Sequence, residues 1–466
     1  MTPPDGAEPP RIDLPHPFEL GVATSAYQIE GAWDEGGKGP SIWDVFSQTP
    51  GKVVHDIPGD RGVDHYHRMP SDVALLASLG VDSYRFSLSW SRLLPEGTGQ
   101  VNRVGVDFYL RLFDALADAG ISANVTLYHW DLPQALEDRG GWLNRDVQHW
   151  FGEYAAVAYD LFGDRAARWA TLNEPIANWA GYGMGVFAPG KTGALSGRTA
   201  MHHALLAHGQ AVSAFRASGA QGEIGIVVDV WKRSAVDPTP ENLQRVRDQD
   251  ADAHEAFLNP LFKGGYSDHQ VERWREDGSM PQVRDGDEAL AAAPIDFFGL
   301  NIYNRVLVDA EPGDEARTGF VGGNFLDSGK FYDPEVAYEV LGLLHQEYRV
   351  PVPIYVTENG IANCSETLDA GRVHDRDRIE YVRGFLHAIA RAAADGVDVR
   401  GYYLWSFLDN YEWSLGYSER YGIVHVDFGS FERTPKDSAY WFRDVIAERS
   451  LWVDAPGVAG RPGRST

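Results

Sequence analysis

Residues 83–90 (SYRFSLSW), 106–119 (VDFYLRLFDALADA) and 122–130 (SANVTLYHW) decide the fold of this chain. The first and third segments are short runs rich in aromatic and aliphatic residues, which is typical of strands that are buried on both faces and pair in parallel. The segment between them has helical periodicity and stops at Gly120. This stretch therefore predicts one strand–helix–strand unit.

The same unit recurs along the chain. Similar apolar runs are found at residues 18–25 (FELGVATS), 168–173 (RWATLN), 223–231 (EIGIVVDVW), 296–303 (DFFGLNIY), 353–358 (PIYVTE) and 399–408 (VRGYYLWSFL). Helical periodicity also marks residues 71–79, with Ser71 as the expected N-cap, and residues 378–394. About eight strand–helix units predict an α/β fold, a single (β/α)₈ TIM barrel with its active site at the C-terminal ends of the strands.

An open, doubly wound sheet is the main alternative fold. It would usually show a Gly-rich phosphate turn after its first strand. The only similar segment, GGKG at residues 36–39, lacks the Ser or Thr that follows the lysine of a phosphate loop. The sequence therefore favours the barrel.

No linker or low-complexity tract interrupts the pattern, so we expect one catalytic domain at residues 14–456 between disordered tails at 1–13 and 457–466. The formal net charge of −26 argues against nucleic acid or an anionic membrane as a partner. The one cysteine, Cys364, allows no intrachain disulfide. The N-terminus lacks the features of a signal peptide, and no apolar run is long enough to span a membrane, so we expect a soluble, cytoplasmic protein.

Polar and aromatic residues collect at the ends of the predicted strands. In a barrel these ends meet on one rim, where catalytic residues lie. Each residue alone could have a structural role, but a purely structural barrel would not place so many on one rim. The residues at this rim are Gln28 and Glu30; Arg85 and Trp90; His129 and Trp130; Asn173 and Glu174; Asn301 and Tyr303; Glu358; and Trp405, Glu412 and Trp413.

Two of these residues, Glu174 and Glu358, are acids at the ends of different strands. Paired carboxylates across a barrel mouth are typical of glycoside hydrolysis. A separation of about 5 Å leads to retention of anomeric configuration, and one of about 6.5–9.5 Å leads to inversion. The sequence alone leaves this choice open.

The segments at residues 171–175 (TLNEP) and 355–360 (YVTENG) resemble glycoside hydrolase family 1, the β-glucosidases and their relatives. The resemblance covers nearly the whole chain apart from its tails. It includes residues 18–44 (FELGVATSAYQIEGAWDEGGKGPSIWD), 84–92 (YRFSLSWSR), 127–136 (LYHWDLPQAL) and 406–428 (SFLDNYEWSLGYSERYGIVHVDF).

The resemblance implies a role for each matching residue. Glu174 is expected to be the acid/base and Glu358 the nucleophile of a retaining reaction. Arg85 and Tyr303 are expected to keep Glu358 ionised, since a cation and a hydroxyl donor favour the charged form. Asn173 is expected to bind the sugar 2-hydroxyl, and Asn301 to lie on that side, near the nucleophile. The other sugar-binding residues implied are Gln28, His129, Trp130, Tyr303, Glu412 and Trp413, with Trp405 as the stacking platform.

The resemblance also limits the substrate. Relatives that act on 6-phosphorylated sugars carry a Ser, then Lys and Tyr, in the last loop, whereas this chain has Glu412. We therefore expect an unphosphorylated β-D-glucosyl residue, as in cellobiose, short cello-oligosaccharides or aryl glucosides. Many relatives place Trp two residues after the acid/base, where this chain has Ile176, so the aglycone preference is open.

No cofactor or metal is expected. His65 and His67, and also His202, His203 and His208, are interpreted as packing residues. Three rival functions remain open from sequence: a retaining transglycosylase, an inverting hydrolase, and a sugar-binding protein without activity. The last would normally have lost one carboxylate, and both are present. The oligomeric state cannot be predicted.

Overall fold

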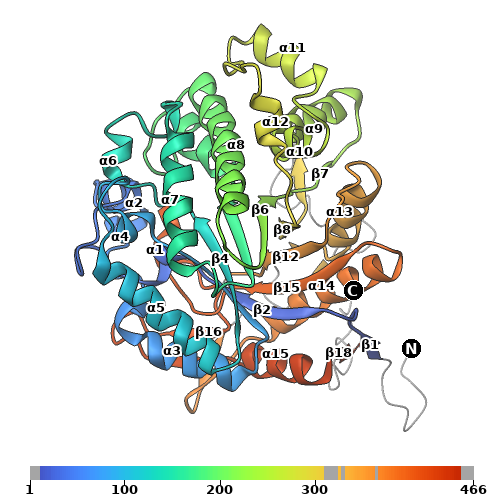
Figure 1. The fold of residues 1–466 in the computed structure, drawn as a ribbon. Coiled ribbons are helices and arrows are strands. Elements are labelled where there is room, and N and C mark those ends of the chain that lie inside the picture. Colours follow the sequence, from blue (N-terminus) through green and yellow to red (C-terminus); the bar gives the residue numbers. More distant parts are fainter. Residues whose placement is uncertain (1–10, 309–323, 327–330, 363–365, 453–466) are drawn as a thin grey trace.

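A computed structural model describes residues 11–308, 324–326, 331–362 and 366–452 of the chain. Eight parallel strands close into a barrel in the order β12-β15-β2-β3-β4-β5-β6-β8, at the centre of Figure 1. Each strand lies within, or one residue beyond, one of the eight predicted runs, so the barrel prediction is confirmed and the open sheet is excluded. The strands are β2 (Glu19–Ala23), β3 (Ser83–Ser87), β4 (Ser122–Tyr128), β5 (Arg168–Asn173), β6 (Glu223–Asp229), β8 (Phe297–Asn301), β12 (Ile354–Asn359) and β15 (Val399–Trp405).

Helices follow each barrel strand and surround the sheet (Figure 1). The long ones are α3 (His65–Leu79), α5 (Arg103–Asp118), α7 (Val147–Phe162), α8 (Ala194–Ala217), α13 (Glu335–Gln346), α14 (Arg376–Ala394) and α15 (Asp437–Glu448). After β6 the connection is built from α9 (Pro240–Asp252), α10 (Glu255–Phe262), α11 (Asp268–Glu276) and α12 (Asp287–Ala291). Short helices line the rim: α1 (Ala26–Ile29), α2 (Ile42–Ser47), α4 (Trp90–Leu93) and α6 (Gln134–Glu137).

Two-stranded ribbons decorate the barrel. They pair β7 (Arg233–Ala235) with β9 (Val306–Val308), β10 (Asn324–Phe325) with β11 (Phe331–Tyr332), β13 (Thr367–Asp369) with β14 (Arg372–His374), and β16 (Val424–Val426) with β17 (Arg433–Pro435). Within the described ranges, no helix combines the length and the apolar character needed to cross a bilayer.

The N-terminal boundary is corrected by a ribbon at the base of the molecule. Residues 11–13, which we expected to be disordered, form β1 (Arg11–Asp13), paired antiparallel with β18 (Ser450–Trp452). This strand is held by a partner more than 400 residues away, a contact that composition does not reveal. Residues 1–10, the tail at 457–466 and Cys364 lie outside the described residues.

The helix start expected at Ser71 is also wrong. Helix α3 begins at His65, and Pro70 lies inside it. The buried His65 Nδ1 lies 2.8 Å from Asp72 Oδ2, which joins the first turn to the next ones. His65 and His67 both lie in this helix, and the buried pairing of His65 supports the packing interpretation for that residue. His67 is exposed and bonds to Asp64 and Glu35.

Side chains along a barrel strand point alternately into two apolar clusters, one outside the sheet and one inside the barrel. On β6, Ile224, Ile226 and Val228 belong to the large apolar cluster between sheet and helices. Val227 belongs instead to the small cluster inside the barrel, with Tyr355, Trp405 and other inward residues. Because side chains of a strand alternate, Asp229 points inward like Val227, but one pleat nearer the C-terminal rim.

Arg168 closes the opposite end of the barrel. Its guanidinium donates to Glu19 Oε1 at 2.8 Å, to Glu223 Oε2 at 3.0 Å and to the Tyr355 hydroxyl at 2.9 Å. These partners come from β2, β6 and β12, so one mostly buried cation ties four strands together at the floor. Removing one partner of such a group leaves the others unpaired.

We predict that Arg168→Ala lowers the free energy of unfolding by about 2–3 kcal/mol, because two partly buried carboxylates lose their cation. Urea denaturation measures this change. Arg400→Ala is the matched control, since Arg400 pairs with Asp398 at the surface and should change stability by less than about 1 kcal/mol. Equal effects of the two changes would contradict the proposed role of Arg168.

Candidate active site

A cavity of about 170 Å³ opens at the C-terminal ends of the strands. Most of the residues that line it were predicted from the sequence, and the structure brings them together from separate strands and loops. The lining residues are His129, Trp130, Glu174, Trp231, Tyr303, Glu358, Trp405, Glu412, Trp413 and Tyr421. The two carboxylates of the predicted catalytic pair therefore face one cavity.

Glu358, on β12, is held from both sides. Arg85 Nη1 on β3 donates to Glu358 Oε1 at 2.6 Å, and the Tyr303 hydroxyl donates to Oε2 at 2.8 Å. The Arg85 side chain is fully buried and that of Glu358 is 4% exposed, so this ion pair is shielded from water. A cation and a hydroxyl donor both stabilise the ionised carboxylate, which is the form a nucleophile needs.

Glu174, directly after β5, has the opposite environment. Its pKa lies well above the usual range, because of burial and the negative charges of Asp229 and Glu358. The amide of Asn301, which donates to Glu174 Oε1 at 2.7 Å, and Arg85 oppose this shift only in part. Glu174 is therefore suited to carry a proton at neutral pH.

An amide network joins the two carboxylates. Arg85 Nη2 donates to Asn173 Oδ1 at 2.6 Å, and Asn301 Nδ2 donates to the same oxygen at 3.1 Å. Asn301 also accepts from the Thr357 hydroxyl at 2.8 Å. Asn301 pairs with Glu358 in the register of the sheet, so it lies beside the nucleophile as expected. Its side chain also bonds directly to the acid/base and to Thr357.

Aromatic rings wall the cavity. His129 lies roughly parallel to Trp405 and to Trp413, with centroids 5.8 and 5.9 Å away. Trp130 packs on Trp413 at 4.5 Å, and its indole donates to the Asn173 carbonyl at 2.9 Å. Burial and the nearby Arg85 lower the pKa of His129 well below its usual range, so this imidazole is neutral. Flat apolar faces of this kind suit the C–H face of a sugar ring.

Backbone conformations at the rim are unusual for three of these residues. Trp130, Glu174 and Trp413 all have positive φ angles, of 78°, 42° and 54°. Side chains other than glycine rarely adopt this region, and such residues concentrate at functional sites. The Glu174 N–H donates to the Val227 carbonyl at 2.9 Å, which fixes this turn to the neighbouring strand.

Glu412 lies opposite the catalytic pair on the loop after β15. Gln28 Nε2 donates to Glu412 Oε2 at 3.2 Å, and also to Asn410 Oδ1 and the Tyr411 carbonyl. Gln28 is fully buried, so in this structure it supports the Glu412 loop. Burial, with the charge of Glu358 nearby, raises the pKa of Glu412 to about 8. Glu412 is therefore largely protonated at neutral pH.

Three residues of the site were not predicted. Trp231 and Tyr421 line the cavity, and Asp229 is the buried neighbour of Glu174. Asp229 and Trp231 lie at the end of the run at residues 223–231. This run was predicted to be a strand, but the residues at its end were not counted among those of the rim. Tyr421 lies in a segment used only for its resemblance.

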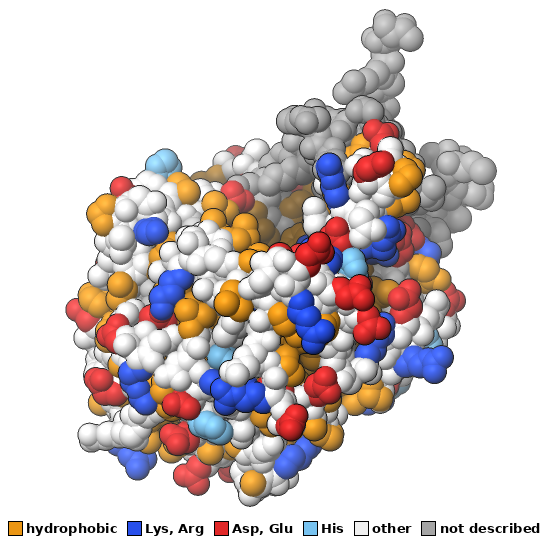
Figure 2. Space-filling model, turned by 90° about the horizontal axis from the view of Figure 1, so that it is seen from above, with side chains coloured by type: hydrophobic (Ala, Val, Ile, Leu, Met, Phe, Trp, Pro, Cys, Tyr) orange, Lys and Arg blue, Asp and Glu red, His pale blue; other side chains and the backbone are white. Residues whose placement is uncertain are grey.

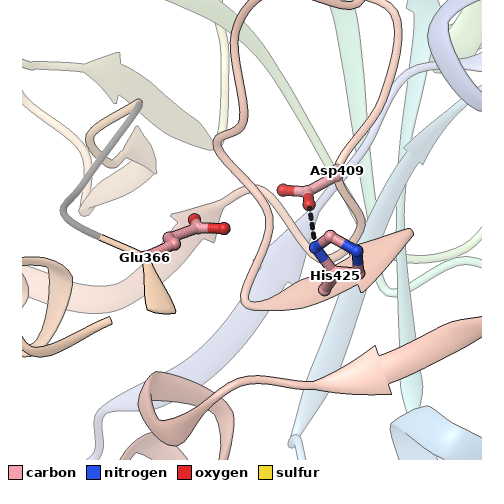
Figure 3. Close-up of side chains that lie close together, drawn as sticks. All are labelled: Glu366, Asp409 and His425. Carbon is pink, nitrogen blue, oxygen red and sulfur yellow. Dashed lines mark ion pairs between the residues drawn. The ribbon is translucent and has the colours of Figure 1, made fainter. Parts of the chain in front are cut away.

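Glu366, Asp409 and His425 are a candidate metal site among the described residues, because their ligand atoms lie within 4.8 Å of one another (Figure 3). Lys436 Nζ donates to Glu366 at 2.6 Å and to Asp409 at 2.8 Å, and Arg420 donates to Asp409 at 2.7 Å. Protein cations thus neutralise these acids already. The group forms an ion-pair network and does not line the catalytic cavity.

The surface charge is mixed. On the face shown in Figure 2, Lys and Arg side chains are scattered among acidic ones. Such a surface offers no continuous basic stripe on this face, the feature that a nucleic-acid backbone would require.

Comparison with known proteins agrees with this geometry. The model of glycosyl hydrolase family 1 matches residues 11–451. β-Glucosidase A of Acetivibrio thermocellus is 40% identical over 444 residues, which are 94% of this chain and 98% of that protein. β-Glucosidase A of Thermotoga maritima is 42% identical over 442 residues, with 94% and 98% covered.

Solved structures show the same likeness in three dimensions. The β-glucosidase from Thermotoga maritima in complex with glucoimidazole superposes with a TM-score of 0.87 at 41% identity. The match covers 94% of this chain and all of that one. With the barrel, the paired carboxylates and these relatives in agreement, this chain belongs to glycosyl hydrolase family 1.

Proposed function

We propose that this protein is a retaining β-glucosidase, which hydrolyses terminal non-reducing β-D-glucosyl residues through a covalent glycosyl-enzyme. One observation carries the proposal: two carboxylates in one cavity have opposite environments. Arg85 and Tyr303 stabilise the charge of Glu358, whereas burial and neighbouring charges keep the proton on Glu174. The names of the relatives support the glucoside substrate.

The proposed reaction has two displacements. A Glu358 oxygen attacks the anomeric carbon while Glu174 gives its proton to the leaving oxygen, and the glycosidic C–O bond breaks. Glu174, now ionised, takes a proton from water, whose oxygen attacks the anomeric carbon and displaces Glu358. The Asn173 amide, oriented by Arg85, is suited to bind the 2-hydroxyl. The cycle ends with Glu174 protonated again.

We propose glucose without phosphate as the sugar in the cavity. Among the described residues that line it, none is Lys or Arg, so a phosphate group would find no cation there. Glu412 is largely protonated at neutral pH. The absence of a cation from the lining therefore disfavours a phosphate more than repulsion by a charged Glu412 does. A protonated carboxyl can both donate to and accept from a sugar hydroxyl.

The residues that would contact the leaving group differ from those of many relatives. Ile176 is partly buried against the core and supplies no ring. We propose that Trp231 and Trp130 serve as apolar surfaces for the aglycone, and that cellobiose and short cello-oligosaccharides are substrates. A role in cellulose degradation, cytoplasmic localisation and a single catalytic domain that begins with β1 at residue 11 complete this proposal.

Transglycosylation is the second candidate, because the glycosyl-enzyme can pass its sugar to an acceptor instead of water. The apolar walls beside Glu174 favour binding of a sugar acceptor. Product analysis with cellobiose separates the two functions. A hydrolase releases glucose at low and high substrate concentration, whereas a transglycosylase forms longer products even when substrate is dilute.

We predict that Glu358→Ala lowers kcat for an aryl β-glucoside by more than about a thousandfold, because no nucleophile remains. Azide should restore turnover of this variant and give a glycosyl azide of the opposite anomeric configuration. NMR of the first-formed product measures both results. The wild type should release the β-anomer first. Normal activity of Glu358→Ala would refute the assignment, and release of the α-anomer by the wild type would indicate inversion.

We predict that the effect of Glu174→Ala depends on the leaving group. Substrates with poor leaving groups need the proton, so their turnover should fall by about a hundredfold or more. Activated aryl glucosides should still show a fast first burst of phenol followed by slow deglycosylation. Stopped-flow absorbance measures the burst. Equal losses for all leaving groups would argue against the acid/base role.

We predict that Glu412→Ser lowers kcat/KM for glucosides about tenfold or more, because hydrogen bonds to the sugar are lost. Glu412→Gln should lose much less at pH 6, since an amide resembles the protonated carboxyl in size and hydrogen bonding. Steady-state kinetics at pH 6 compares the two variants. Two equally impaired variants would mean that the ionised form is the one required.

A further inference from the structure

Asp229 is a third carboxylate in the upper layer of the barrel. It is the last residue of β6 and points inward, as established by the alternation with Val227. In the register of the sheet it lies beside Asn301, the residue whose amide bonds to Glu174. It is 7% exposed, so its carboxylate is removed from water in the layer that holds the catalytic pair.

Asp229 is connected to the wall of the cavity. The Trp231 side chain hydrogen-bonds to Asp229. Trp231 also stacks on Tyr303, with ring centroids 5.5 Å apart and planes 12° from parallel. Tyr303 in turn donates to Glu358. Asp229 thus helps to position Trp231, which packs on Tyr303, the residue that donates to the nucleophile Glu358.

The charges that face Asp229 come from several elements. Glu174 after β5 and Glu358 on β12 are acidic neighbours, and Arg233 on β7 is a cation. Arg233 is already bonded to Asp250 at 3.1 Å. Burial raises the pKa of Asp229 to about 6, so Asp229 is largely ionised at neutral pH. Among the charged groups that raise the pKa of Glu174, Asp229 ranks above Glu358.

We propose that Asp229 is a positioning residue for the acid/base: its buried negative charge keeps the proton on Glu174, and its hydrogen bond orients Trp231 on the leaving-group side. This inference rests on the proposed glycosidase function. It assigns to Asp229 a role that the two-carboxylate scheme does not contain.

The charge of Asp229 matters most after the first displacement. When Glu358 becomes an ester its negative charge is gone, and Glu174 loses one of the two charges that favour its protonation. Asp229 keeps its charge throughout the cycle. Glu174 therefore remains a stronger base for activating water than it would be with Glu358 as its only acidic neighbour.

The test compares Asp229→Asn with the wild type. The amide is close in size and can still accept from Trp231, but it has no charge. All variants, and the wild-type background with which they are compared, carry Glu412→Gln, so that residue 412 does not titrate in this range. The basic limb of the kcat/KM profile then reports ionisation of the acid/base, and in Asp229→Asn it should move to lower pH by about half a unit or more. At high pH the loss should be larger for cellobiose than for an activated aryl glucoside. Asp229→Glu, which restores a charge, should move the limb back toward its wild-type position.

Glu419→Gln is the matched control. It removes one negative charge near Glu412 but is not among the main groups that act on Glu174. We expect its basic limb to coincide with that of the wild type. An unchanged limb in Asp229→Asn, or an equal shift in Glu419→Gln, would overturn the inference.

Circular dichroism checks that each variant is folded, and Asp229→Ser is a second neutral variant for the same profile if the amide variant is unstable. The glucosidase function and the role of Asp229 can be refuted separately. A wild type without β-glucosidase turnover refutes the proposed function, whereas normal turnover with an unshifted limb in the neutral variant refutes only the role of Asp229.

Discussion

The buried guanidinium of Arg85 is the contact on which the rest of the site depends. It donates to Glu358 on β12 and to Asn173 on β5, and it comes itself from β3. A cation this deep is tolerated only when its partners are fixed around it, since its desolvation must be offset by close hydrogen bonds. The need to satisfy Arg85 therefore fixes the position of the nucleophile and of the amide that faces the sugar.

The position of Arg85 also sets the different roles of the acidic residues in the site. Arg85 contacts Glu358 directly, whereas it is linked to Glu174 through Asn173 and Asn301. Glu174 is also a neighbour of the acidic Asp229. The carboxylate nearest the cation is stabilised as an anion, and the one nearest the other acids keeps its proton. Opposite protonation states of two similar side chains thus follow from position. Glu412 is partly buried near Glu358, and its pKa is raised, like that of Glu174.

Much of this could be predicted from the sequence. Local patterns located all eight barrel strands, and the strand ends contained Glu174, Glu358, His129 and Trp405. Contacts over long sequence separations could not be predicted. The pairing of β1 with β18, the start of α3 at His65 and the bond between Asn301 and Glu174 each depend on a partner far along the chain or on buried packing.

The sequence by itself determined the barrel and its catalytic pair, because strand periodicity and motifs are local. Only the tertiary structure decided how the side chains point, because the strands do not alternate strictly near the rim. Register shifts interrupt β5 before Asn173 and β12 before Glu358. Thr171 bonds to His208 on α8, so it faces outward, whereas Asn173 meets Arg85 inside. β6 has no such shift, and simple alternation aims Asp229 at the same site.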